Sequence, residues 1–468
     1  MSFKRPLTAL ALFTILAVLA LPSALAQQLA SITGTATDPT GAAIPGVHVT
    51  IKSASTGATY NGVTNGAGTY SLTDIKPGPD YVITFSHSGF KTVSVSGVYM
   101  NVAATRTQNV KLPLGVQSQT VTVSAASQDV TLDTTNATLG NNFQVQFLQN
   151  LPIANRDSPS VLFTQQPGVS SGGNSSQTGA TTGARVDQDR VTLDGLDVND
   201  MATGQFGAIV ANAPVDSVQE FRGVVAGDQS NAMAGGGGHF ELVTKSGTNH
   251  FHGDLNEYHR DTDLEANNWF SNNAGVPRAP LIRNQFGGDI GGPILKNRLF
   301  FYFDYNGRRD TLSNVETRVV PLDSFRNGTL TYIDNTGAHQ SLSPAQVASL
   351  DPLGIGFNPA LLKLFSSRYP HANDFSIGDG LNTAGFRFNA PFPYKENDYV
   401  ARLDWTINSK MKLFAVTHVT RINSTQNAIQ FPGDPETFPF LDKSYSWVIG
   451  HTWAINDHMV NQAYLGET

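Results

Sequence analysis

Apolar and polar residues alternate along several segments in the second half of this chain. Residues 397–408, NDYVARLDWTIN, place bulky apolar side chains at every second position, with charged or polar groups between them. Residues 299–309 and 444–455 repeat the pattern. Successive side chains of a β-strand point to opposite faces, so each segment is predicted to be a strand with one apolar face and one polar face. The apolar positions, called here the apolar-face residues, are Leu299, Phe301, Phe303, Tyr305, Tyr399, Leu403, Trp405, Tyr445, Trp447 and Ile449.

The connections between the predicted strands alternate between tight and long. Short turns on one side and long loops on the other are typical of an outer-membrane barrel, whose tilted strands of about 10 residues cross the bilayer. The apolar-face residues are then predicted to contact lipid, and the opposite face to line a polar lumen. A soluble sandwich alternates in the same way and remains the alternative. Strands are predicted at 251–260, 284–292, 299–309, 397–407, 411–422, 444–455 and 458–468, with tight joins at 293–298, 408–410 and 456–457 and long ones at 261–283, 310–396 and 423–443.

The first part of the chain has short β-prone runs separated by turn clusters rich in Gly, Pro and Asn. Within one such run, Val47, Val49 and Ile51 share a face. Runs of this length and spacing, from residue 31 to about residue 113, predict a small antiparallel β-sandwich. Residues 129–249 have weaker periodicity and Gly-rich interruptions, which favours a compact domain with mobile loops.

The N-terminus has the features of a secretory signal peptide. Lys4 and Arg5 precede an apolar run that ends at Pro22, and residues 24–26, Ala-Leu-Ala, offer a cleavage site. After Gln27 no apolar run reaches the length of a transmembrane helix. Acidic residues outnumber basic ones, 37 to 30, which argues against a nucleic-acid partner. Export without such a helix leaves a soluble exported protein or a β-barrel.

Several long motifs resemble known families. GTATDPTGAAIPGVHVTIKSASTG, from Gly34, resembles the carboxypeptidase regulatory-like domain, an auxiliary sandwich that implies no proteolysis. NLPIANRDSPSVLFTQQPGVSSGG and GARVDQDRVTLDGLDVND resemble the plug of TonB-dependent outer-membrane receptors, specifically the Oar-like branch, and NQFGGDIGGPILKNRLFFYFDYNGRR resembles that family's second and third barrel strands. The expected fold is mainly β, with an N-terminal β-sandwich, an α+β plug domain and an incomplete antiparallel transmembrane β-barrel. The expected divisions are a signal peptide at 1–26, the sandwich at 27–115, a linker at 116–128, the plug at 129–249 and the first barrel strands at 250–468.

The barrel expected here is incomplete. The resemblance implies a barrel of about 22 strands, whereas roughly seven are predicted before Thr468. An open sheet edge leaves backbone groups unpaired in lipid, at a cost of several kcal/mol each. The chain is therefore predicted to be a fragment that does not transport by itself.

The resemblance implies energy-coupled uptake of an unidentified extracellular ligand at the cell outer membrane. The implied partners are outer-membrane lipid, the ligand, and the periplasmic protein TonB with its inner-membrane ExbB-ExbD complex; sandwich and plug lie on the periplasmic side. TonB must pair with an exposed, β-prone segment without proline. A run between sandwich and plug meets these conditions, although a last sandwich strand or a plain linker explains it equally well. The candidate TonB-contact residues are Thr120, Val121, Thr122, Val123, Ser124 and Ala125.

Charged residues of the predicted plug are candidates for polar contacts with the lumen wall, with ordinary solvated charges as the default. The aspartates at 187–200 do not have the spacing of a calcium-binding EF-hand, and Asp194-Gly195 is predicted to form a tight turn. The four histidines between 239 and 259 are interpreted as surface groups rather than metal ligands. No catalytic residue, metal or cofactor is expected. The candidate plug–barrel contacts are Arg156, Arg185, Arg190, Glu220 and Arg222.

The excursion at 318–395 is too long to be a mere connector. Helical spacing at Pro344–Leu350 and Pro359–Phe365, with Ser343 as a cap, predicts two short helices. They would bind or gate a ligand, or form a packed loop without a ligand role.

Two other function classes stay open. One is an outer-membrane adhesin or structural barrel without transport, and the other is an exported enzyme with an accessory β-sandwich. No nucleophile-elbow or zinc-protease motif supports the enzyme.

Overall fold

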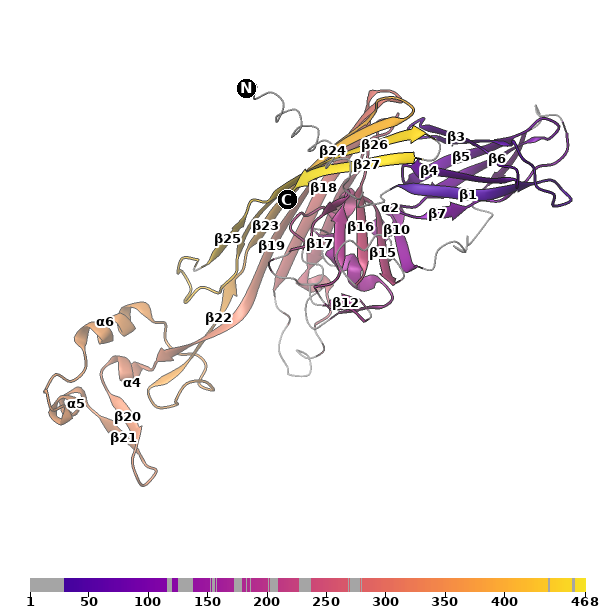
Figure 1. Cartoon of the computed structure of the whole chain (residues 1–468). Coiled ribbons are helices and arrows are strands. Elements are labelled where there is room, and N and C mark those ends of the chain that lie inside the picture. The colour runs from indigo at the N-terminus through magenta and orange to yellow at the C-terminus, as the bar shows by residue number, and fades with distance from the viewer. Residues whose placement is uncertain are drawn as a thin grey trace, which may run out of the picture.

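The computed structural model describes most of the chain from residue 29 to residue 468. An N-terminal sandwich, a middle domain and a long twisted sheet follow one another (Figure 1). The predicted signal peptide and Ala125 of the candidate TonB-contact residues lie outside the described residues. Those left out are 1–28, 116–119, 125–137, 152, 154–155, 157, 172–178, 182, 186, 201, 203–208, 227–236, 268, 270–277, 279, 437 and 457–458.

Two β-sheets pack face to face in the N-terminal domain, which confirms the predicted sandwich. Val49, Ile51, Ile83 and Phe85 are fully buried between them, because alternate positions of each strand point inward. One sheet has the order β4 (Thr69–Ile75), β1 (Ala30–Thr37), β7 (Thr105–Thr107), with β8 (Val110–Lys111) also on β1; the other has the order β3 (Thr59–Val63), β2 (His48–Ser53), β5 (Gly78–Ser86), β6 (Thr92–Met100), β9 (Thr120–Ser124).

The segment predicted to contact TonB forms the last strand of the second sheet. β9 pairs in parallel with β6, from Thr92 opposite Thr120 to Ser96 opposite Ser124. Thr120 and Val121 are exposed. Of the two alternatives that the sequence left open, an edge strand of the sandwich is therefore the arrangement in this structure, and it extends the sandwich past residue 115.

The middle domain has a five-stranded sheet and its own apolar core. The rings of Phe163 and Phe240 stack with their centroids 4.7 Å apart, and Phe221 stacks on Phe163 at 5.6 Å. The sheet has the order β10 (Leu139–Gln144), β15 (Val218–Ala226), β16 (His239–Thr244), β13 (Arg190–Leu193), β14 (Leu196–Asp197), accompanied by α2 (Val145–Asn150), the 3-10 helices η2 (Pro159–Gln165) and η3 (Val215–Ser217), and the pair β11 (Val169–Ser171) and β12 (Gly179–Thr181).

The predicted barrel strands form one antiparallel sheet in which sequence neighbours pair. Its edges among the described residues are β17 and β27, so the sheet does not close there. The 3-10 helix η4 (Thr262–Leu264) follows β17. The main order is β17 (Leu255–Asp261), β18 (Leu281–Leu295), β19 (Leu299–Pro321), β23 (Tyr394–Thr406), β24 (Met411–Thr425), β26 (Tyr445–Asn456), β27 (Met459–Glu467), with β22 (Thr383–Pro391) on β19 and β25 (Pro439–Asp442) on β24.

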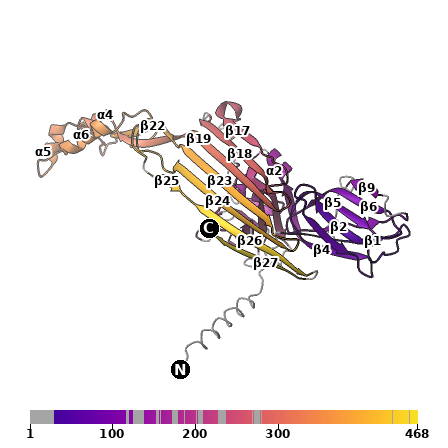
Figure 2. The same cartoon turned by 90° about the horizontal axis from the view of Figure 1, so that it is seen from above.

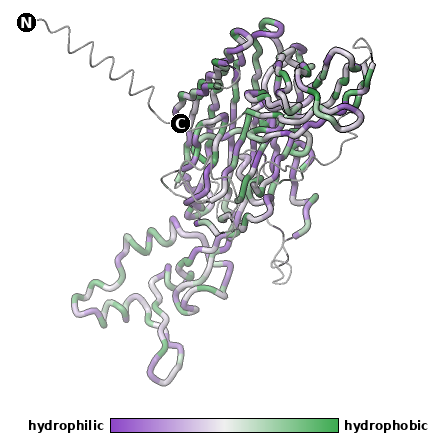
Figure 3. Tube along the Cα trace, turned by 45° about the vertical axis from the view of Figure 1, so that its right-hand side comes forward, coloured by the Kyte–Doolittle hydropathy of each residue, from purple (hydrophilic) through white to green (hydrophobic). Residues whose placement is uncertain are grey.

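The two faces of this sheet separate as the alternation predicted. Phe303, Leu403 and Tyr445 are exposed, whereas Tyr302 and Asp304 on the opposite face are buried. Register keeps the apolar-face residues together, since Phe301 pairs with Leu403 and Tyr305 with Tyr399. Hydrophobic and hydrophilic residues alternate along these strands in Figure 3. Contact of the apolar-face residues with lipid stays a prediction. No helix among the described residues is long and apolar enough to cross a membrane.

The long excursion projects from a ribbon formed by β19 and β22. It lies at the end of the barrel strands away from the sandwich (Figures 1 and 2). Both predicted helices are confirmed, and Ser343 caps the first through a reciprocal capping box with Gln346. The elements of the excursion are α4 (Asp323–Arg326), β20 (Leu330–Ile333), β21 (His339–Leu342), α5 (Pro344–Leu350) and α6 (Pro359–Arg368).

Candidate functional site

A hairpin of the middle domain points its turn at the inner wall of the barrel sheet. β13 and β14 are joined by Asp194 and Gly195, whose φ angles are +50° and +85°. Two positive φ angles in a two-residue connection are typical of the tight hairpin turn predicted from the sequence. Aspartate tolerates this conformation better than bulky residues do, so the turn can carry a carboxylate at its tip.

The Asp194 carboxylate is fully buried and bonded from two sides. Arg402 of β23 donates to its Oδ1 at 2.7 Å. The backbone amide and hydroxyl of Thr244, at the end of β16, donate at 3.1 and 2.9 Å. Burial by itself would raise the pKa of Asp194, but the Arg402 charge, the neighbouring His418 of β24 and the hydrogen bond from the Thr244 amide bring the pKa below its usual value. The carboxylate is therefore held ionised.

Arg402 is one of the polar residues on the inward face of NDYVARLDWTIN. Its Nε donates to Asp404 Oδ2 at 2.9 Å, so one guanidinium contacts two carboxylates. The guanidinium also lies 4.7 Å from the ring centroid of Phe414. A Cβ on Gly450 would stand 2.1 Å from that ring, so the glycine leaves room for Phe414 beneath the arginine.

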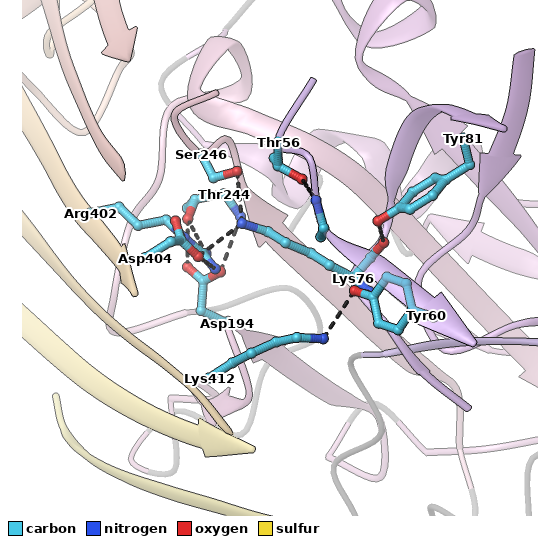
Figure 4. A network of polar contacts seen from close by, with 11 residues as sticks. Thr56, Tyr60, Lys76, Tyr81, Asp194, Thr244, Ser246, Arg402, Asp404 and Lys412 are labelled. Carbon is cyan, nitrogen blue, oxygen red and sulfur yellow. Dashed lines mark hydrogen bonds and ion pairs between the residues drawn. The ribbon is translucent and has the colours of Figure 1, made fainter. Parts of the chain in front are cut away.

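The N-terminal sandwich reaches the same cluster from the other side (Figure 4). Lys76 Nζ donates to Asp404 Oδ1 and to Ser246 Oγ, both at 2.9 Å. Four alternating charges, Lys76, Asp404, Arg402 and Asp194, thus connect sandwich, barrel sheet and middle domain. Each carboxylate has a cation beside it, which is the condition for burying such charges.

A second cation comes from the barrel to the sandwich. Lys412 of β24 donates to the hydroxyl of Tyr60 at 3.0 Å and to the carbonyl of Asp74 at 3.2 Å. Its ammonium also lies 4.2 Å from the ring centroid of Tyr60. Lys76 of the sandwich and Lys412 of the barrel sheet therefore cross the interface between them in opposite directions.

Further polar contacts join the middle domain, or the segment leaving it, to the barrel sheet. Lys245 forms an ion pair with Asp289 of β18 at 2.7 Å. Arg156 forms an ion pair with Asp216 at 2.8 Å, and its guanidinium lies 4.5 Å from the ring centroid of Tyr258 of β17. Arg156, predicted as a plug–barrel contact, thus touches a barrel strand.

The other predicted plug–barrel contacts have different partners. Arg185 pairs with exposed Asp187, and Arg190 with Asp197, all within the middle domain. Glu220 accepts hydrogen bonds from the amide of Val102 and from Asn142, and Arg222 donates to the carbonyl of Ala103 and pairs with Glu241. For Glu220 and Arg222 the interdomain contact shown is with the sandwich, because β15 faces the loop that follows β6.

Burial raises the pKa of Glu220 to about 7, despite its two hydrogen bonds. The aspartates at 187–200 have separate roles here, and Asp189 accepts from Thr181 and from the amide of Gly238. Among the described residues, no three His, Asp or Glu side chains lie together as metal ligands would.

Sequence reasoning missed Lys76, Lys412 and Asp289, and it assigned Asp194 only to a turn. Arg402 and Asp404 had a usable signal, since they are charged residues on the predicted inward face of a barrel strand. Lys76 carries no such signal, because its partner lies 328 residues away in sequence.

Two of the three parts of the chain match families of known proteins. Residues 243–468 match the family described as outer membrane beta barrel domain, and residues 31–113 match the carboxypeptidase regulatory-like domain. The TonB-dependent transporter Oar of Myxococcus xanthus is 26% identical over 248 residues, which are 51% of this chain and 23% of that protein. Over that stretch the chain is similar to a TonB-dependent transporter. Its second half matches an outer-membrane barrel domain, and the location of the protein is the outer membrane.

Solved structures of outer-membrane receptors resemble this chain in part. The outer-membrane transporter YddB of Escherichia coli has 11% identity and a TM-score of 0.43, over 70% of this chain and 38% of that one. A mutant ferric enterobactin receptor of Pseudomonas aeruginosa has 14% identity and a TM-score of 0.40, over 70% and 40%. The chain spans about a quarter of the curated relative's length.

Proposed function

We propose that the protein is an energy-coupled outer-membrane receptor whose middle domain is the plug, displaced when TonB pulls on its periplasmic side. The proposal extends to this protein what the name of its relative states, dependence on TonB and transport. TonB would act with its inner-membrane ExbB-ExbD complex on an extracellular ligand that the chain does not identify. No enzymatic step is part of this proposal.

The observation that carries it is the buried pair of Asp194 and Arg402. The apolar core of the middle domain consists of residues of that domain alone. It is joined to the barrel sheet by discrete polar contacts at Asp194, Lys245 and Arg156, with an apolar contact of Leu196 beside them. A domain with a separate core and few directional contacts can leave its seat as a unit, since displacement does not expose that core.

TonB contact is proposed at residues 120–125, of which Thr120–Ser124 form β9. β9 is the last strand of its sheet among the described residues, and the exposed side chains of Thr120 and Val121 allow a partner to approach. A further strand can add to such an edge through backbone hydrogen bonds. TonB would either extend this sheet or replace β6 as the partner of β9.

The test uses the full-length protein in outer-membrane vesicles and the purified C-terminal domain of the host's TonB as probe. Deleting residues 120–125 is expected to abolish binding of the probe. Deleting residues 126–131, an equal number of residues immediately after that segment in the sequence, is the control and should leave binding in place. Equal binding by the two deletions would remove the assignment of the contact.

The transport step has its own test. A strain with the receptor gene should deplete compounds from the medium that the same strain without TonB leaves untouched. Depletion that does not require TonB would contradict energy coupling, whatever the vesicle assay shows.

Adhesion is kept as a second candidate because of the excursion. Leu353 and Phe375 are largely exposed there, at 79% and 74%. Exposed apolar groups of this kind are frequent at interaction surfaces. Removing residues 322–382 would abolish attachment to surfaces and spare TonB-dependent depletion if adhesion is the main role, whereas loss of depletion would favour a ligand-binding loop.

A further inference from the structure

We infer that the N-terminal sandwich is an intramolecular latch that holds the plug in its seat, acting through Tyr60, Lys76, Asp404 and Lys412. These four residues are called the latch below. The inference deepens the proposed function, on which it rests only in taking the middle domain as the plug. It assigns a task to a domain that otherwise stands beside the barrel as an accessory.

The latch begins with the fixed position of Lys76. Its backbone amide donates to the Tyr60 hydroxyl at 3.1 Å, and its carbonyl accepts from the Tyr81 hydroxyl at 2.7 Å. Both tyrosines belong to strands of the sandwich, so Lys76 is anchored before its side chain crosses the interface (Figure 4). A pre-organised donor loses less conformational entropy when its bond forms.

Lys76 contacts the barrel wall and the plug exit with the same ammonium group. Asp404 belongs to β23, and Ser246 to the segment that leads from β16 to the barrel. The sandwich therefore bridges the two parts that must separate for the plug to move. The amide of Asn249, in the same exit segment, adds a hydrogen bond of 2.8 Å to the carbonyl of Ser55 in the sandwich.

The effect on Asp194 follows from the order of charges. Arg402 is shared between Asp194 and Asp404, and Lys76 neutralises Asp404 from the sandwich side. Without Lys76, one guanidinium faces two carboxylates in a buried place, with His418, 3.6 Å from Asp194 Oδ2, as the further titratable neighbour of Asp194. Arg402 is then drawn towards Asp404, and the repulsion between the carboxylates falls on Asp194 of the plug.

Lys412 makes the latch two-sided. Its side chain enters from the barrel, and the Tyr60 hydroxyl that it contacts is the group that also accepts from the Lys76 backbone. Loss of Lys412 would free Tyr60 and so loosen the position of Lys76. Loss of either lysine is therefore expected to loosen the seating of the plug.

The experiment measures hydrogen–deuterium exchange of the plug hairpin, residues 190–197, in the full-length protein without ligand and without TonB. Lys76→Met and Lys412→Met should each speed this exchange by about tenfold, the usual order for losing a hydrogen bond to a charged group. Lys52→Met is the matched control, since Lys52 is an exposed lysine of the same sandwich. Lys76→Arg keeps the charge and should restore near-normal exchange.

A second measurement tests the docking of the sandwich on the barrel sheet separately from the effect of that docking on the plug hairpin. The chain has no cysteine, so Ser71→Cys in the sandwich and Ser409→Cys in a tight barrel turn give unique spin-label sites. The distance between labels should be sharply distributed in the parent and broadened by combining Lys76→Met with Lys412→Met.

Three results would overturn the inference. They are exchange in Lys76→Met equal to that in Lys52→Met, an undocked sandwich with unchanged exchange of the hairpin, and an unbroadened distance in the double variant. None of them bears on TonB dependence, which the depletion test decides separately.

Discussion

Asp194 and Arg402 lie 208 residues apart in the chain and form a buried ion pair of 2.7 Å. The aspartate stands at the tip of a hairpin turn in the middle domain, and the arginine on the inward face of a barrel strand. A buried carboxylate is costly without a cation beside it, and Arg402 supplies that cation to Asp194. The pair is therefore the contact by which the seating of the middle domain is best tested.

Removing the arginine should destabilise the seated middle domain. Arg402→Met leaves the Asp194 carboxylate buried without its cation, which costs ~3–5 kcal/mol in comparable cases. The measurement is the urea dependence of middle-domain unfolding in the full-length protein. Arg421→Met on β24 serves as control, because Arg421 is exposed and bonds to backbone carbonyls only. Equal midpoints for the two variants would contradict a seating role for the pair.

The contact between the middle domain and the sandwich should weaken as pH rises. Glu220 has a pKa of about 7 in the folded protein and 4.5 as its ordinary value, because burial disfavours the charge. Between these values the folded state keeps a proton that the unfolded state releases, so stability falls as pH increases from 4.5 to 7. The loss is at most about 3 kcal/mol. The measurement is the difference between the unfolding midpoints at pH 5 and pH 8. This difference should be smaller in Glu220→Gln than in the parent. In Glu257→Gln, the control at an exposed position, it should equal that of the parent.

The phenylalanine stack should be the main apolar support of the middle domain. Phe163→Ala removes a fully buried ring that packs against both Phe221 and Phe240 and should lower the free energy of unfolding by ~3–5 kcal/mol. Phe147→Ala provides the matched control, since half of that side chain is exposed. A loss for Phe163→Ala no larger than the control's would show that the ring does not carry the core.

The apolar-face residues should be reachable from the hydrocarbon of the bilayer. Spin labels at Phe303→Cys and Leu403→Cys are expected to be broadened by a lipid-dissolved relaxation agent in the full-length protein. A label at Val400→Cys, on the buried face of the same strand as Leu403, should be shielded. Shielding at all three positions would mean that protein covers the outer face.

The local sequence pattern was sufficient to predict an element wherever the determining residues lie within a few positions of one another. The period of two in NDYVARLDWTIN determined a strand and its two faces, because a pleated backbone turns every second side chain the same way. Ser343 and Gln346 determined the start of a helix by bonding each other's backbone. Asp194-Gly195 determined a tight turn, because both positions accept a positive φ.

Boundaries between elements were less well predicted. β17 begins at Leu255 rather than at the predicted residue 251. Just before the strand, the amide of Asp254 donates to the Asp289 side chain. β19 runs on to Pro321, because β22 returns beside it and pairs with its outer half. Each of these limits depends on a partner strand distant in sequence, and no local pattern contains that partner.

The sequence by itself determined the alternating strands, the sandwich and the polar character of the inward barrel face. Only the tertiary structure decided which charges meet, so Glu220 and Arg222 contact the sandwich while Asp194 and Lys76 approach the barrel. The physical reason is range. Strand periodicity arises from backbone geometry within a few residues, whereas a buried ion pair needs two groups brought within a few ångströms by everything folded between them.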